Sequence, residues 1–326
     1  MPSATAASAP DINPADPVLH LRFDARGKRV AEDDPDEAYE WYHLKRGTPE
    51  ADAWFAQAGL SPLVLSALTA DETRPRCTVD GDGVLINLRG INLMEGADPE
   101  DMVSVRFYVE SRRVISAWHR PLHAVADLFA AVARGQGPTS PGDLIAKVAL
   151  RLADRVEPIV SALNDRIDDL EEQVLDERPG AMRKDLGDIR RMAIMLRRFM
   201  FPQRDALTTL EIEDLDWLLP HDRNRVREAG ERTTRLAEEL EAIRDRATVV
   251  QEQVMDQRAE TMNRTMLLLA VVTAIFLPLG LITGVLGINV GGIPGADNPR
   301  AFWEVCVLLG ALVGFQLALF KWLKIF

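Results

Sequence analysis

Cysteine and histidine are scarce in this chain, which has two cysteines and five histidines among 326 residues. Cys77 and Cys306 are far apart, and neither belongs to a CxxC motif or a Cys/His cluster. A disulfide scaffold and a structural zinc site are therefore not indicated. No histidine has a motif partner, so we expect ordinary surface or core side chains at His20, His43, His119, His123 and His221.

Motifs for catalysis and nucleotide binding are also missing. No GxxxxGK[ST] loop occurs, so nucleotide hydrolysis is not expected. No set of residues forms a recognisable catalytic constellation, and nothing indicates a covalently bound cofactor. We therefore expect a protein that is not an enzyme.

Positive charge is in deficit, because 38 Lys and Arg face 50 Asp and Glu, a formal net charge of −12. Nucleic-acid-binding proteins need a basic face, so a nucleic-acid partner is not expected. The negative balance suits a protein that gathers cations, although many soluble proteins are as acidic.

A secretion signal is absent from the N-terminus. Residues 1–17 are rich in Ala, Pro and Ser and lack the basic start and apolar run of a signal peptide. We expect a disordered tail there, followed by a region that stays in the cytoplasm.

Residues 18–142 have the pattern of an α/β (α+β) domain. Short helices are predicted at 48–59, with Thr48 as N-cap, and at 62–70. Segments rich in β-branched and aromatic residues predict strands at 18–24, 40–44, 76–80, 83–91, 102–110 and 112–119. A Gly- and Pro-rich break over 135–142 ends the domain.

Residues 143–264 are predicted to be a helical bundle and stalk. Two helices are expected at about 143–176 and 180–210, and a third begins near His221. A continuous helix of roughly 55 residues would be about 80 Å long, enough to link a cytoplasmic domain to a pore. Its apolar positions recur at 3-4 spacing as a coiled-coil seam, at Val226, Ala229, Thr233, Leu236, Leu240, Ile243, Ala247, Val250, Val254, Gln257 and Thr261.

Residues 265–326 contain two long apolar runs. No charged residue occurs over 265–296, and 267–286 are all apolar or small. A helix needs roughly 20 such residues to cross a membrane. We expect spans at 265–287 and 302–323, joined by an outer loop over 288–301. Pro278 should remove one backbone hydrogen bond from the first span and bend it.

Flanking charge predicts how this hairpin is oriented. Arg258 and Arg264 precede the first span, Lys321 and Lys324 follow the second, and the loop carries a single basic residue, Arg300. Basic residues stay on the inner side, so both chain ends should be cytoplasmic. Two spans cannot enclose a pore, so any conducting form must contain several copies. The alternative is a membrane-anchored coiled-coil scaffold without a transport role.

Two further features could contact cations. Acidic residues cluster on the first long helix at Asp165, Asp168 and Asp169, and on the stalk at Glu238 and Glu239. They are either a solvated helix face or a surface that attracts cations. The glycine-rich segment 287–295 contains Asn289, whose carbonyl oxygen could meet a cation or its water shell. The alternative is a simple hairpin loop.

Residues 262–289, MNRTMLLLAVVTAIFLPLGLITGVLGIN, resemble the pore helix and signature of the CorA family of divalent cation transporters. That signature is usually Gly-Met-Asn, whereas this chain has Gly287, Ile288 and Asn289. The change, with the GGIPG that follows, resembles the zinc-transporting ZntB branch. Residues 72–76 and 197–205 agree with the family, and the resemblance extends from about Tyr39 nearly to the end of the chain.

The resemblance implies a funnel-shaped homopentamer in the bacterial inner membrane. Gly287, Ile288 and Asn289 would form the outer entrance, with Asn289 contacting the hydrated ion. The pore-facing side of the first span would be Asn263, Met266, Leu269, Thr273, Leu277 and Gly280. This face lacks Asp, Glu, His and Cys, so zinc should pass at least partly hydrated. Apolar rings at Met266 and Leu277 could gate by dewetting.

Two points of this interpretation stay open. A magnesium, cobalt or nickel channel of the CorA type is the alternative to zinc. The ZntB resemblance suggests proton coupling, yet no titratable side chain occurs over 265–296.

Overall fold

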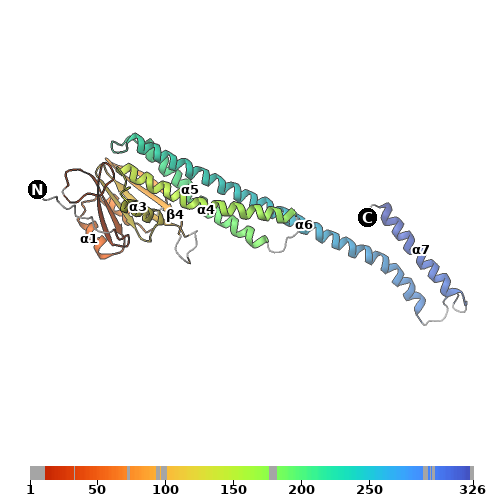
Figure 1. Cartoon of the computed structure of the whole chain (residues 1–326). Helices are drawn as coiled ribbons and strands as arrows, with labels where there is room; N and C mark the ends of the chain where they lie inside the picture. The colour runs from red at the N-terminus through yellow and green to blue at the C-terminus, as the bar shows by residue number, and fades with distance from the viewer. Residues whose placement is uncertain are drawn as a thin grey trace. The chain divides into compact units, whose positions relative to one another are not determined.

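The computed structural model describes residues 12–32, 34–71, 74–92, 96, 101–175, 182–288, 293, 295 and 298–323. The chain separates into two compact units, Met1–Gln251 and Glu252–Phe326. The first unit contains a sheet and most of the helices, and the second contains the end of one long helix and a further helix (Figure 1).

The first unit is built on a six-stranded mixed sheet in the order β1-β2-β6-β5-β4-β3. All neighbouring strands are antiparallel except β2 and β6, which run parallel. The strands are β1 (Val18–Asp24), β2 (Glu37–Lys45), β3 (Arg76–Asp80), β4 (Gly83–Gly90), β5 (Val103–Val109) and β6 (Arg113–Trp118). The expected mixed domain is confirmed, with every strand inside or overlapping its predicted segment.

Two short helices pack on one face of this sheet. α1 (Pro49–Gln57) and α2 (Pro62–Thr69) each begin with a proline in the first turn and are capped by Thr48 and Ser61. These side-chain oxygens accept a hydrogen bond from an otherwise unpaired backbone N–H of the first turn. The predicted cap at Thr48 is therefore present, and the face is closed by a small apolar core.

A larger core fills the opposite face of the sheet, where α3 (His123–Ala133) and α4 (Pro141–Leu175) pack together. No helix was expected from the sequence at α3. This helix starts after Pro121, and its N-cap, Leu122, makes no side-chain hydrogen bond. Its only signal was a short apolar run, which does not distinguish a helix from a buried strand.

Long helices α4, α5 (Met182–Ile212) and α6 (Pro220–Gly287) continue the chain (Figure 1). The predicted seam of α6 is buried from Val226 to Val254 within this one chain. Ion pairs join α6 to its neighbours, from Arg232 to Asp154 of α4 and from Arg197 of α5 to Glu241. The heptad pattern thus describes packing inside the chain along this stretch, where the same spacing could also have served pairing between chains.

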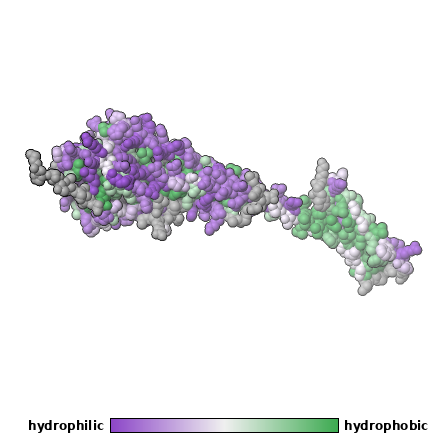
Figure 2. Space-filling model, in the orientation of Figure 1, coloured by the Kyte–Doolittle hydropathy of each residue, from purple (hydrophilic) through white to green (hydrophobic). Residues whose placement is uncertain are grey.

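The second unit contains the end of α6 and α7 (Ala301–Trp322). α6 has 68 residues, longer than the predicted stalk, and it passes through Pro278 without ending. Both helices are long and apolar enough to cross a membrane, and none of their apolar window is buried inside the chain. Figure 2 shows these apolar residues as a continuous green surface. The core helix of a soluble protein would be buried, so the exposure favours two membrane spans.

Candidate functional site

One side of α6 in the second unit carries an open groove of about 620 Å³. Four of the residues that the sequence analysis placed on a pore face line it: Met266, Leu269, Thr273 and Leu277. Ala270, Ala274 and Pro278 complete the lining. Positions three or four apart lie on one face of a helix, which is why the four residues meet in one groove. Their role in conduction stays a prediction.

The groove offers one polar side chain, the hydroxyl of Thr273. Its Oγ1 donates a hydrogen bond of 2.8 Å to the carbonyl of Leu269 one turn earlier. This bond uses the hydroxyl hydrogen, so the oxygen lone pairs remain free to accept a hydrogen bond from water around an ion. The other lining side chains are apolar and cannot coordinate a metal ion.

The remaining predicted pore residues lie at the two ends of the groove. Asn263 is exposed one turn before Met266, and Gly280 is exposed after Pro278. Gly287 is the last residue of α6, and Ile288 follows it as an exposed side chain. Asn289, the predicted contact for a hydrated ion, lies outside the described residues. Its role rests on the sequence alone.

Strong metal ligands do not gather anywhere in the described part of the chain. No group of three or more His, Cys, Asp or Glu there is placed to hold a metal ion. Within 265–288, all of which is described, no charged residue, histidine or cysteine occurs. A divalent ion in the groove would therefore meet hydroxyl oxygen, backbone oxygen or its own water shell.

The acidic cluster of the first long helix is partly neutralised. Asp168 and Glu171 of α4 both bind the guanidinium of Arg246 on α6, and the distance from Arg246 Nη2 to Glu171 Oε2 is 2.7 Å. The hydrogen bonds that Arg246 donates to Glu171 and Asp168 raise the pKa of its guanidinium above its usual value. Asp165 and Asp169 remain exposed on the same helix. The cluster thus joins two helices and leaves only part of its charge for cations.

The acidic residues of the stalk also lie near basic side chains. Glu238 and Glu239 are exposed on α6. Glu239 borders a polar groove of about 320 Å³ between α4 and α6, which Arg232 and Arg235 also line. The basic side chains offset the carboxylates, so this groove is a weak attractor of cations.

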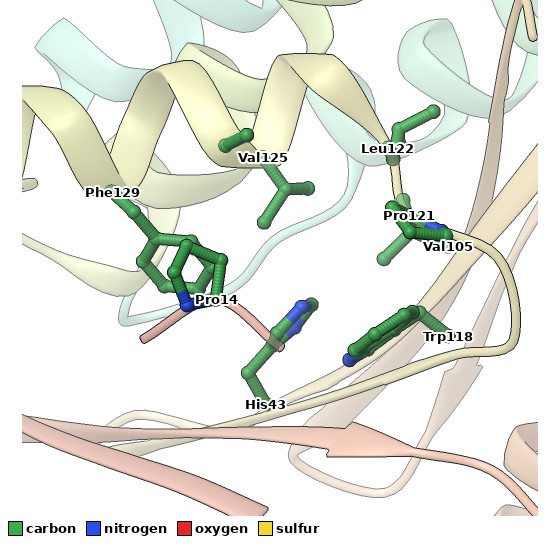
Figure 3. Close-up of a pocket in the computed structure, with 9 residues that line it drawn as sticks. Pro14, His43, Val105, Trp118, Pro121, Leu122, Val125 and Phe129 are labelled. Carbon is green, nitrogen blue, oxygen red and sulfur yellow. The ribbon is translucent and has the colours of Figure 1, made fainter. Parts of the chain in front are cut away.

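A small cavity of about 30 Å³ lies between the sheet and α3. Figure 3 shows His43 of β2 beside the ring of Trp118, with Val125 and Phe129 of α3 opposite. His43 Nδ1 lies 2.7 Å from Ser116 Oγ, and burial lowers the pKa of the imidazole to about 3. The ring is therefore neutral near pH 7, and its apolar walls make this a core histidine, as the sequence analysis expected.

Two buried carboxylates that the sequence analysis did not single out lie where α4 and α6 begin. Asp143 binds Lys147 at 2.8 Å and also Arg225 of α6. Burial alone would raise the pKa of Asp143, but the hydrogen bonds from Lys147 and the Thr139 backbone outweigh it and lower that pKa. The Ser-x-x-Asp spacing of 140–143, a capping pattern, was the signal available in the sequence.

The second of these carboxylates, Asp222, has the opposite balance. Its Oδ2 accepts a hydrogen bond from Ser140, while Oδ1 has no hydrogen-bond donor of good geometry in the described residues. His221 Nε2 is 3.0 Å from Oδ1. Burial is the largest influence and raises the pKa of Asp222. The contacts of Asp143 with Arg225 and of Asp222 with Ser140 join the start of α4 to the start of α6.

Known proteins match this chain over almost its whole length. A family model described as "CorA-like Mg2+ transporter protein" matches residues 36–322. "Divalent cation transporter CmaX" of Pseudomonas aeruginosa is 44% identical over 293 residues, 89% of this chain and 88% of that protein. "Zinc transport protein ZntB" of Pectobacterium carotovorum subsp. carotovorum is 36% identical over 275 residues, 84% of each chain. The solved structure of full-length CmaX matches with a TM-score of 0.81 and 42% identity, covering 94% of this chain and 98% of that one.

Proposed function

Because this chain belongs to the CorA family of divalent cation transporters, we propose that its cargo is zinc and that the ion passes along the groove of α6. Transport of divalent cations follows from the family, and the chain is an ion transporter rather than an enzyme. The identity of the ion and the path it takes are the proposal.

Zinc is supported by relatives and by the signature. Relatives named zinc transport protein reach 36% identity over 84% of the chain. The signature Gly287-Ile288-Asn289 departs from Gly-Met-Asn in the way that resembles the ZntB branch. The relative at 44% identity is named only a divalent cation transporter, so magnesium, cobalt and nickel remain the competing cargo.

A hydrated path is supported by the charge-free groove, and this observation carries the proposal. Zinc held by thiolates, imidazoles or carboxylates would need those side chains in the groove, and none occurs there. The ion instead keeps its water shell. These water molecules donate hydrogen bonds to the hydroxyl oxygen of Thr273 and to the amide oxygen of Asn289. Met266 and Leu277 supply the apolar rings that can close the path by excluding water.

The proposed arrangement in the membrane rests on the same features. One groove on one helix encloses nothing, so we propose a homopentamer in which five copies of α6 surround the path. We place it in a bacterial inner membrane, with both chain ends in the cytoplasm, from the basic residues that flank the hairpin. The exposed carboxylates Asp165, Asp169, Glu238 and Glu239 would then face cytoplasmic cations.

Proton coupling, if it accompanies transport, must avoid a side-chain relay at mid-membrane. No titratable group occurs over 265–296. Asp297 follows directly in the sequence of the outer loop, and Glu304 lies in the first turn of α7. We propose that any pH dependence of flux does not run through a side chain at mid-membrane, and that Glu304, at the outer edge of the second span, is an acid that could contribute.

Flux into liposomes tests the proposed function. Purified protein is reconstituted, and entry of Zn²⁺, Mg²⁺, Co²⁺ and Ni²⁺ is followed singly and in competition, with and without an imposed pH gradient. Zinc should pass and should be displaced poorly by magnesium. If magnesium passes in preference to zinc, the chain is a channel for the alternative cargo. If no divalent ion passes, the result favours a membrane-anchored coiled-coil scaffold.

A further inference from the structure

Pro278 leaves a backbone acceptor without its helical donor in the middle of α6. In an α-helix each N–H donates to the carbonyl four residues earlier, and proline has no N–H. The carbonyl of Ala274 therefore loses its partner, although α6 continues past Pro278 to Gly287. In a lipid environment no water is available to replace the missing donor, so another protein group must do so.

That donor comes from the second helix of the hairpin. Gln316 of α7 places its Nε2 at 3.0 Å from the carbonyl oxygen of Ala274. Gln316 is the only Asn or Gln in α7. The one side-chain amide of this helix thus meets the one carbonyl that Pro278 deprives of its partner.

Nearby hydroxyl groups do not serve this carbonyl. Threonine can donate to a carbonyl one turn earlier, and this often satisfies acceptors in membrane helices. Thr273 donates to Leu269, and Thr283 donates to Leu279, so both are engaged elsewhere. Gln316 Oε1 has no hydrogen-bond partner in the described residues. The bond to Ala274 is the polar contact that positions this amide.

We propose that Gln316 is a positioning residue for ion conduction, supporting α6 at the point where Pro278 interrupts its backbone hydrogen bonds. The inference rests on the proposed function, because the direction of α6 at this point matters for transport only if the groove lines the path. Ala274 and Pro278 both line that groove, directly after Thr273 and Leu277. A change of helix direction at this point moves the apolar ring at Leu277 relative to the hydroxyl at Thr273. Gln316 thereby acts on conduction without touching the ion.

A double-mutant cycle tests the contact. Gln316→Leu removes the donor while keeping a side chain of similar bulk. Pro278→Ala returns an N–H to position 278, so the carbonyl of Ala274 regains a helical donor and no longer needs Gln316. We expect Gln316→Leu to lower divalent flux at least fivefold in the otherwise unchanged protein and less than twofold in the Pro278→Ala background. The midpoint of thermal unfolding in detergent should show the same non-additivity.

A relocated amide is the matched control. Gln316→Leu combined with Leu312→Gln keeps one glutamine in α7 but moves it one turn away from Ala274. This variant should behave like Gln316→Leu alone. Recovery of wild-type flux would mean that the amide acts by its presence in α7 and not by its contact, which would overturn the inference.

The outcomes separate this inference from the proposed function. If the unchanged protein carries no divalent ion, the proposed function fails, and the unfolding midpoints alone still report the hydrogen bond. If the unchanged protein conducts and Gln316→Leu conducts equally well, the positioning role is wrong. If Gln316→Leu does not assemble, its recovery in the Pro278→Ala background supports the contact, and failure to recover contradicts it.

Discussion

Asn289 provides the side-chain amide that we place at the outer entrance of the path. A divalent ion arrives with a tightly held water shell, and removing that shell is costly, above all for magnesium. Amide oxygens accept hydrogen bonds from this water without adding a fixed charge that would retain the ion. Asn289→Ala should lower flux at least tenfold, about 1.4 kcal/mol of lost barrier stabilisation.

The control for this variant is assembly, because alanine leaves Gly287 and the helices unchanged. Asn289→Ala should insert, assemble and unfold like the unchanged protein. Asn289→Asp should bind divalent ions more tightly and slow their release. Normal flux through assembled Asn289→Ala would show that the asparagine is only a loop residue.

Asp143 is the residue whose charge most clearly supports the first unit. It is buried and neutralises Lys147 and Arg225, so Asp143→Asn would leave both cations without their carboxylate. We expect unfolding free energy near pH 7 to fall by about 3 kcal/mol. The folded pKa of Asp143 is lowered, so its stabilisation exists above the usual value of 3.8 and is lost as pH falls through the folded pKa. Denaturant unfolding across this range measures both effects, and an equal loss at every pH would contradict the electrostatic explanation.

Asp222 should respond in the opposite direction, although it lies beside Asp143. Its pKa is raised in the folded chain, chiefly by burial, so folding favours the protonated form. The stability that this preference contributes is present below the usual pKa of 3.8 and is lost as pH rises through the folded pKa. Asp222→Asn keeps an acceptor for Ser140 without the charge. The unfolding free energy of Asp222→Asn, relative to that of the unchanged protein, should increase as pH rises toward 7. An increase confined to acidic pH would contradict a raised pKa of Asp222 in the folded chain.

At the scale of elements, the heptad seam of α6 supports the first unit from inside the chain. Ile243 is 1% exposed, whereas Val249 on the same helix is 52% exposed. Ile243→Ala should lower the unfolding free energy by about 3 kcal/mol through lost burial and an unfilled cavity. Val249→Ala, the matched control, should change it by less than about 0.5 kcal/mol. Denaturant midpoints compare the two, and similar losses would mean that the seam is not buried in solution.

Helices and strands with a strong local signal were predictable, and the exceptions have physical causes. The sheet and the long helices follow from β-branched segments and sustained 3-4 spacing. α3 was missed because neither a capping side chain nor a polar face marks it. The helices that cover the α6 seam were not predictable either. A heptad repeat indicates a buried stripe, but it does not say whether the same chain or another copy covers that stripe.

The candidate site was predictable only in part, again for physical reasons. The shared face of Met266, Leu269, Thr273 and Leu277 follows from helical spacing, although the choice of this face came from the family resemblance. The contact between Gln316 and Ala274 was not predictable, since 42 residues separate them and nothing in the sequence gives the register of α7 against α6. Pro278 predicted that a donor was needed, but not which residue supplies it.

At the scale of the whole molecule, two spans in a chain cannot surround a path for an ion. The groove on α6 lies open, and no residue of its apolar window is buried in the single chain. Lipid or further copies of the chain must cover this surface. Only copies would place five or so threonine hydroxyls around a common axis, which is what a hydrated ion needs to cross an apolar layer.

Light scattering on the detergent-solubilised protein should therefore report a protein mass five times the 36.2 kDa of one chain. The detergent contribution is removed by combining scattering with absorbance and refractive index. Asn289→Ala and Gln316→Leu are measured alongside, so that a loss of flux in either can be separated from a loss of assembly. A closed ring of another number of copies would keep the pore and correct only the fivefold symmetry. A monomer or dimer that still conducts would overturn the pore between subunits, because two or four spans leave the groove of α6, with its Thr273 hydroxyl, against lipid rather than against water.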